Sequence, residues 1–190
     1  MRRMAPTVLI VLLLGLLAGC GPESEQAPLD GGGTGGGGNA ADVAFAQAMI
    51  PHHEQSIELA ELVPQRRTSD YVRELAAEIT RKETAEIERM AQWLRAWGAA
   101  VPSAADHAGH AMPGMLAPGA IPALQAAPDD AFEQRWLRTL ATHLGHGIDM
   151  AEKLLAQGSH PGTRTLAENI VNAQQAEVAT INDRLAAARG

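Results

Sequence analysis

Apolar residues recur at spacings of three and four along four segments of the chain, which is the pattern of amphipathic α-helices. The second, third and fourth segments span about 69–97, 129–157 and 163–187. The first runs from about 42 to 63 and carries its apolar residues at Phe45, Met49, Ile50, Ile57, Ala60 and Val63. The pattern therefore predicts an all-α protein.

Residues with special backbone preferences mark where these helices begin and end. Ser69 is a good N-cap for the second helix, and Gly98 follows its last apolar residue. The third helix is expected to be capped by Asp129 or Asp130. Pro51 lies inside the first helix, where we expect a kink or a break because proline removes one helical hydrogen bond.

The four helices are expected to pair into two hairpins, 42–98 and 129–187. A loop rich in Ala, Pro and Gly, 99–128, joins them. Short links inside each pair and one long link between pairs are typical of a four-helix bundle.

The two hairpins also resemble each other in sequence. A shift of 91 residues, without a gap, places residues 57–60 on 148–151, with isoleucine first and alanine last in both. The same shift places Ile79 on Ile170 and His52 on His143. Matches at one constant offset indicate a duplicated hairpin, with approximate two-fold symmetry in the bundle.

The N-terminus has the features of an export signal. Arg2 and Arg3 precede an apolar run, 8–17, that is too short to span a bilayer, which needs about 20 apolar residues. Small residues then lead to Cys20 in the sequence Leu-Ala-Gly-Cys. This resembles the lipobox of bacterial lipoproteins, so residues 1–19 are expected to be a signal peptide and Cys20 to be lipidated. Lipidation would anchor the chain to the extracytoplasmic side of a membrane, whereas the alternative is a buried N-terminal helix.

The segment after Cys20 separates this anchor from the helices. Residues 20–41 contain eight glycines and no aromatic residue, a composition that predicts a flexible tether. The remaining residues, 42–190, have the length of one domain with a single core.

Cysteine content and charge limit the partners. Cys20 is the only cysteine, so once it is lipidated any soft metal ligand must be methionine or histidine. Removal of the signal peptide leaves 13 basic and 22 acidic residues, a net charge of −9. Nucleic acid is therefore not expected as a partner.

The motif Met-Ile-Pro-His-His, residues 49–53, resembles the bacterial family called domain of unknown function 305. Phe45 before it, and Gln174, Glu177 and Val178 in the second half, match further parts of the family pattern. The resemblance covers roughly 42–185 and implies a ferritin-like helical bundle. Because some members are implicated in copper binding outside the cytoplasm, it also implies a metal-handling role.

The chain departs from this family pattern at several positions. In the second half a second His-His pair is replaced by His143-Leu144-Gly145-His146, and Leu140 stands in place of the methionine. Glu83 replaces the usual glutamine in the first half.

Histidine and methionine side chains share helix faces in both hairpins. Met49 precedes His52 and His53 by three and four residues, and His143, His146 and Met150 follow an i, i+3, i+7 spacing. Imidazole suits Cu(II), Zn and Ni, and thioether sulfur selects Cu(I). These six residues are therefore predicted to bind copper, Cu(I) or Cu(II).

Four polar residues on the facing helices are predicted to orient these imidazoles: Glu83, Glu86, Gln174 and Glu177. The alternative is that the same polar residues satisfy buried structural histidines, with Met49 and Met150 as ordinary core side chains. A possible second metal site lies in the loop, which contains His107, His110, Met112 and Met115. The alternative for that loop is a solvent-exposed linker without a ligand.

The favoured function is a membrane-anchored copper-binding protein that buffers copper or confers copper tolerance. One alternative is an envelope lipoprotein that binds protein or has a structural role and needs no metal. Another is a ferritin-like oxidase, but the Glu-x-x-His pairs of di-iron sites do not occur at these histidines. No catalytic residue is predicted.

Overall fold

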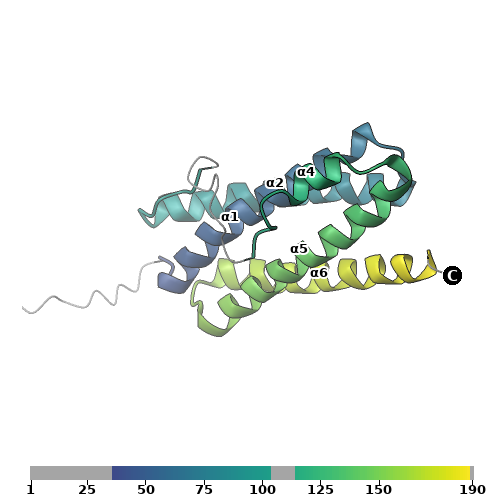
Figure 1. The fold of residues 1–190 in the computed structure, drawn as a ribbon. Helices are drawn as coiled ribbons and strands as arrows, with labels where there is room; N and C mark the ends of the chain where they lie inside the picture. Colours follow the sequence, from purple (N-terminus) through teal and green to yellow (C-terminus); the bar gives the residue numbers. More distant parts are fainter. Residues whose placement is uncertain (1–35, 104–113, 189–190) are drawn as a thin grey trace, which may run out of the picture. The chain divides into compact units, whose positions relative to one another are not determined.

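The structure is a computed structural model in which residues 36–103 and 114–188 are described. These residues form five α-helices, one short 3₁₀ helix and no strand, which confirms the all-α prediction (Figure 1). The long helices are α1 (Ala40–Glu61), α2 (Asp70–Ala96), α5 (Asp129–Gln157) and α6 (Pro161–Ala187). The 3₁₀ helix η1 (Val63–Gln65) follows α1, and the short α4 (Ala120–Gln125) precedes α5.

Helix α1 begins at a capping box and continues through its proline. The Asn39 side chain accepts hydrogen bonds from the first turn, and the Asp42 carboxylate accepts one from the Asn39 backbone. The helix is continuous across Pro51, which is buried, so of the expected kink or break the break does not occur. One missing hydrogen bond is tolerated here because the flanking residues pack into the interior.

The other helix ends agree only partly with the sequence. Ser69 caps α2 as predicted, with its side chain accepting from Val72. The cap predicted for α5 is wrong: its N-cap is Pro128, and Asp129 and Asp130 lie in the first turn instead. There their negative charges still interact favourably with the positive end of the helix dipole.

Two segments expected to lack regular structure have defined roles. Helix α4 forms inside the predicted loop 99–128 because Ile121 and Leu124 are buried against the core. His160, which carries no obvious sequence signal, caps α6 by accepting a hydrogen bond from the Thr163 backbone.

The helices pack as two hairpins, α1 with α2 and α5 with α6, and α1 also packs on α5. Two apolar clusters fill the interior. The Phe45 cluster includes Phe45, Met49, Met90, Leu94, Leu154 and Ile170. The Trp136 cluster includes Leu59, Leu75, Ile79, Phe132, Trp136, Leu140 and Ile181. Each large side chain that is buried there stabilises the fold by about 1.5–3 kcal/mol.

Helices α1, α2 and α6 carry buried polar residues between the parts that they contribute to the two clusters, and on α5 His143 lies next to Leu144 at the end of the Trp136 cluster. We call these residues the polar layer: His52, His53, Ser56, Glu83, Glu86, His143 and Gln174. On α1, for example, Met49 belongs to the Phe45 cluster and Leu59 to the Trp136 cluster, with the three polar residues between them. The candidate site therefore lies between two apolar cores.

Positions related by the 91-residue shift have similar surroundings in part of the structure. The 91-residue shift takes Phe45 to Trp136 and so maps one apolar cluster onto the other. Met49 and Leu140 are both fully buried, which confirms their predicted equivalence. The same holds for Ile79 and Ile170, but Ile57 and Ile148 are only half-buried, contrary to the expectation that they are core residues.

A membrane span is not found in the described part of the chain. None of its helices combines the length and the apolar character needed to cross a bilayer.

Candidate functional site

His52 of α1 and His143 of α5 stack on each other at the centre of the polar layer. Their ring centroids are 3.8 Å apart and the rings are inclined by only 7°. The His52 Nε2–H donates to the His143 carbonyl at 3.1 Å, and the His143 Nε2–H donates to the His52 carbonyl at 3.0 Å. This reciprocal pair, related by the 91-residue shift, joins the two hairpins.

These hydrogen bonds fix the protonation of both rings. Because a carbonyl can only accept, Nε2 carries the proton and Nδ1 presents a lone pair. Neither Nδ1 atom has a hydrogen-bond partner. Burial lowers the pKa of His52 to about 2 and that of His143 to about 4, so both imidazoles are neutral at physiological pH. Neutral imidazole is the form that binds metal ions.

His53 points to different partners. Its Nε2 lies 2.8 Å from Glu86 Oε2, and its Nδ1 lies 3.5 Å from Glu83 Oε2. Burial by itself lowers the pKa of His53, but the two carboxylates raise it above its usual value. Burial raises the pKa of Glu83 to about 6. His53 thus pairs with carboxylates of α2, and only its Nε2 makes a hydrogen bond.

The two methionines of the predicted metal site occupy different surroundings. Met49 is fully buried in the Phe45 cluster. Met150 is half-buried and approaches Gly114, where an added Cβ would lie 3.0 Å from Met150 Sδ, 3.7 Å from His146 Cβ and 3.9 Å from His52 Cδ2. The structure therefore gathers Met150, His146 and His52 around Gly114, and it leaves Met49 in the core.

His146 is held by the chain that enters α4. Its Nδ1–H donates to the Gly114 carbonyl at 3.0 Å, which leaves the lone pair on Nε2. No sequence pattern identified Gly114, whose φ of 87° favours glycine and whose position depends on the tertiary fold.

Gln174 and Glu177 make no hydrogen bond to the nitrogens of the stacked rings. Gln174 is 3% exposed and its Oε1 has no hydrogen-bond partner. It lies beside Gly147, where an added Cβ would be 2.6 Å from Gln174 Oε1 and 3.0 Å from His52 Cε1. Glu177 is half-buried, and burial raises its pKa. Gly147 corresponds to Ser56 under the 91-residue shift, so the repeat could have identified it as a position that requires a small residue.

Two predicted features lie largely outside the described residues. Cys20 is among them, and so are His107, His110 and Met112 of the loop. Met115 is described and half-buried, and the next residue, Leu116, donates its backbone N–H to Gln55 at 2.7 Å.

The donors that are present suit a soft or borderline metal ion. Among residues 36–103 and 114–188, no three His, Asp or Glu side chains are grouped as they would be around a metal ion. The unpartnered imidazole nitrogens of His52 and His143, the Nε2 lone pair of His146 and the Met150 thioether, which lies towards the Cδ2 edge of His52, nevertheless supply both nitrogen and sulfur donors. Such a set fits copper better than a hard cation.

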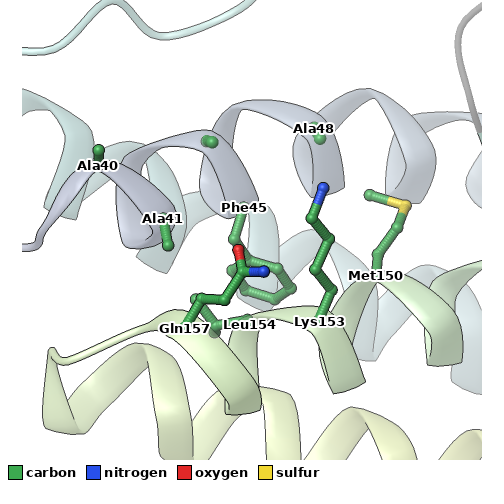
Figure 2. A pocket seen from close by; sticks show the side chains of 9 residues that line it. Ala40, Ala41, Phe45, Ala48, Met150, Lys153, Leu154 and Gln157 are labelled. Carbon is green, nitrogen blue, oxygen red and sulfur yellow. The ribbon is translucent and has the colours of Figure 1, made fainter.

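An apolar groove of about 630 Å³ lies between α1 and α5 (Figure 2). Phe45, Leu154 and alanines of α1 line it, with Lys153 and Gln157 on α5. Met150 is the only residue that it shares with the group around Gly114. The groove is thus a feature separate from the stacked histidines.

Comparison with solved structures finds the same fold in several proteins. A DUF305 fragment from Deinococcus radiodurans is 28% identical with a TM-score of 0.68, and the match covers 79% of this chain and 98% of that one. A putative secreted DUF305 protein from Streptomyces coelicolor is 28% identical with a TM-score of 0.69, covering 77% and 92%.

A third similar protein, CopM, is known in copper-bound forms. Its Cu(I)-bound form is 26% identical with a TM-score of 0.66, covering 78% of this chain and 98% of CopM. Its Cu(II)-bound form is 28% identical with the same TM-score, covering 76% and 95%. Comparison with curated proteins finds no match. The family model for the domain of unknown function DUF305 matches residues 42–185, and the chain therefore belongs to the DUF305 family.

Proposed function

We propose that this protein binds copper outside the cytoplasm, through the imidazoles of His52, His143 and His146 and the thioether of Met150. One observation carries the proposal: two neutral, buried imidazoles each keep an unpartnered Nδ1 lone pair. Buried acceptors without a partner cost about 1–3 kcal/mol each, and binding of a cation would offset that cost.

The similarity to CopM, which has been solved with Cu(I) and with Cu(II), supports the choice of metal. The donor types agree with it, because imidazole accepts both oxidation states and thioether favours Cu(I). Met49 and His53 are left out of the proposed ligand set, since Met49 packs in the apolar core and His53 pairs with Glu86. The site gives the protein the chemistry to hold and release copper ions.

The proposal extends to architecture and location. We infer that the two hairpins form one four-helix bundle of the ferritin-like type, a single domain over residues 42–190. Cys20 would hold this domain at the membrane through the tether at 20–41. The loop residues His107, His110, Met112 and Met115 would offer a second place for a soft cation, close along the chain to Gly114.

Copper titration of the detergent-purified full chain tests the function. At a free copper concentration 100 times the Kd, binding should stabilise the fold by about 2.7 kcal/mol. We expect His52→Ala with His143→Ala to lose most of this gain, and Met150→Leu to lose the Cu(I) part without unfolding the protein. His160→Asn is the control, since asparagine can keep the α6 cap while one imidazole is removed. Equal stabilisation of all variants would refute the proposed site.

Anchoring is tested separately. Cys20→Ser should leave an unprocessed precursor or release the protein from membrane fractions, because serine cannot form the thioether to lipid. Fractionation of cells that express either form gives the result. If the serine variant is still a processed membrane protein, the proposed anchor is wrong.

A further inference from the structure

Gln174 brings an oxygen atom to the unoccupied edge of the His52 ring. Its side chain is 97% buried and its Oε1 has no hydrogen-bond partner. The absence of a side chain at Gly147 lets this oxygen and His52 Cε1 border the same space, 2.6 Å and 3.0 Å from the point that a Cβ would occupy. His52 Nδ1, which also lacks a partner, is bonded to Cε1 within the ring.

These two atoms cannot satisfy each other. An amide oxygen and an imidazole lone pair are both acceptors, so the cost of burying them is removed by a donor or a cation between them, or by rotation of the amide so that its N–H faces Nδ1. Buried polar atoms in proteins almost always have a hydrogen-bond partner.

The two edges of the His52 ring face different donors. Met150 Sδ and His146 lie towards Cδ2, around Gly114, whereas Gln174 Oε1 lies towards Cε1, beside Gly147. A thioether selects Cu(I), and an oxygen ligand favours a harder, divalent ion. The free Nδ1 is bonded to Cε1 and not to Cδ2, so the oxygen lies towards the nitrogen that could bind a metal ion, whereas the sulfur lies at an edge without a lone pair.

The first hairpin has a side chain at the position equivalent to Gly147. The 91-residue shift takes Gly147 to Ser56 and Gln174 to Glu83. There the Ser56 hydroxyl donates to the His52 carbonyl at 3.5 Å, and Glu83 Oε2, which likewise lacks a hydrogen-bond partner, lies 3.5 Å from His53 Nδ1. The polar side chain therefore faces an ion-pair partner in the first hairpin, whereas its neutral counterpart in the second hairpin does not.

We propose that Gln174 is an oxygen ligand for a divalent metal ion held by His52, and that it makes the site accept Cu(II) as well as Cu(I). This inference rests on the proposed copper-binding function. It gives Gln174 a direct role at the metal in place of the orienting role predicted from the sequence.

Cu(II) titration of the full chain, read by affinity and by the electron paramagnetic resonance spectrum, tests the role of Gln174. We expect Gln174→Leu to weaken Cu(II) binding by at least about tenfold and to alter the spectrum. Tenfold is about the smallest loss of affinity found when a residue that only orients a metal ligand is replaced, and a direct ligand should matter at least as much. Cu(I) binding should remain unchanged. Gln174→Glu should keep or strengthen Cu(II) binding, because a carboxylate is also an oxygen ligand. Gln175→Leu is the matched control at an exposed neighbouring position.

The leucine variant separates the two possible roles of Gln174. If the amide merely donates to His52 Nδ1, it occupies the lone pair that a metal ion would need, so Gln174→Leu should leave Cu(II) binding unchanged or strengthen it. That result, or an unchanged Cu(II) spectrum in Gln174→Leu, would overturn the inference. A wild-type chain that binds no copper would instead refute the proposed function itself.

Discussion

We expect the copper-free protein to lose stability steeply as the pH falls from about 6.5 towards 4.5, because His52 and His143 stay neutral when folded. Burial lowers the pKa of these groups to about 2 and about 4. On unfolding, both imidazoles return to the ordinary histidine range and take up protons. The unfolded state binds more protons over this interval, so its free energy falls relative to that of the folded state.

Two protons taken up on unfolding give a slope of up to about 2.7 kcal/mol per pH unit. Small domains are stable by only about 5–15 kcal/mol, so this effect is large. Urea unfolding at a series of pH values measures it. His143→Phe keeps a stacked aromatic ring and should remove about half of the slope. A flat profile between pH 6.5 and 4.5 would show that the stacked pair titrates normally.

His53 and its carboxylate partners Glu83 and Glu86 change the stability with pH in the opposite direction. The folded-state pKa values of both His53 and Glu83 are raised, so their contributions are present at low pH and are lost as the pH rises through those values. The folded-state pKa of Glu83 is about 6. Its contribution to stability is therefore lost in the same pH range in which the neutral His52–His143 pair reaches its full contribution. The copper-free protein should therefore be most stable near pH 6, and His53→Leu should flatten only the alkaline side of the profile.

Replacement of Asp42 by alanine should destabilise the protein by about 3–5 kcal/mol. Its fully buried carboxylate accepts backbone hydrogen bonds from Asn39 at 2.8 Å and from Ser159 and His160 at 3.1 Å, together with one from the Thr163 hydroxyl. It thereby ties the start of α1 to the link between α5 and α6. Each buried donor that loses its partner costs about 1–3 kcal/mol.

The pKa of Asp42 gives a second measure of this role. Burial by itself raises it, but the Thr163 hydroxyl and the three backbone N–H groups bring it below the usual value. The contribution of Asp42 is therefore present at neutral pH and is lost as the pH falls through that lowered value. Denaturant unfolding of wild type and Asp42→Ala should differ most above pH 4.

Glu133 is the matched control because it is the counterpart of Asp42 in the second hairpin. It accepts from the Ser69 backbone at 2.7 Å and from the Ser69 hydroxyl at 2.9 Å, but it is only half-buried. Glu133→Ala should thus cost less than Asp42→Ala, about 1 kcal/mol. Equal losses in the two variants, or no loss in Asp42→Ala, would contradict the idea that burial makes this carboxylate important.

The sequence by itself determined the helical class, the limits of all four long helices to within about two residues, and the repeat. Periodic apolar positions such as Phe45, Met49 and Ile79 suffice for this, because an amphipathic helix must bury one face wherever it packs. The 91-residue shift also predicted which buried positions would be equivalent. It paired His52 with His143, and their rings stack on each other in the structure.

Only the tertiary structure decided what each polar residue touches. Adjacent residues on α1 face different helices, so His52 stacks on α5 while His53 pairs with α2. Spacing along one helix cannot predict this, because it fixes the direction of a side chain but not the partner that packing brings to it. The close contacts at Gly114 and Gly147 likewise depend on two segments of the chain meeting where a Cβ would be too close to its neighbours. Packing alone therefore places Met150 near one edge of the His52 ring and Gln174 near the other.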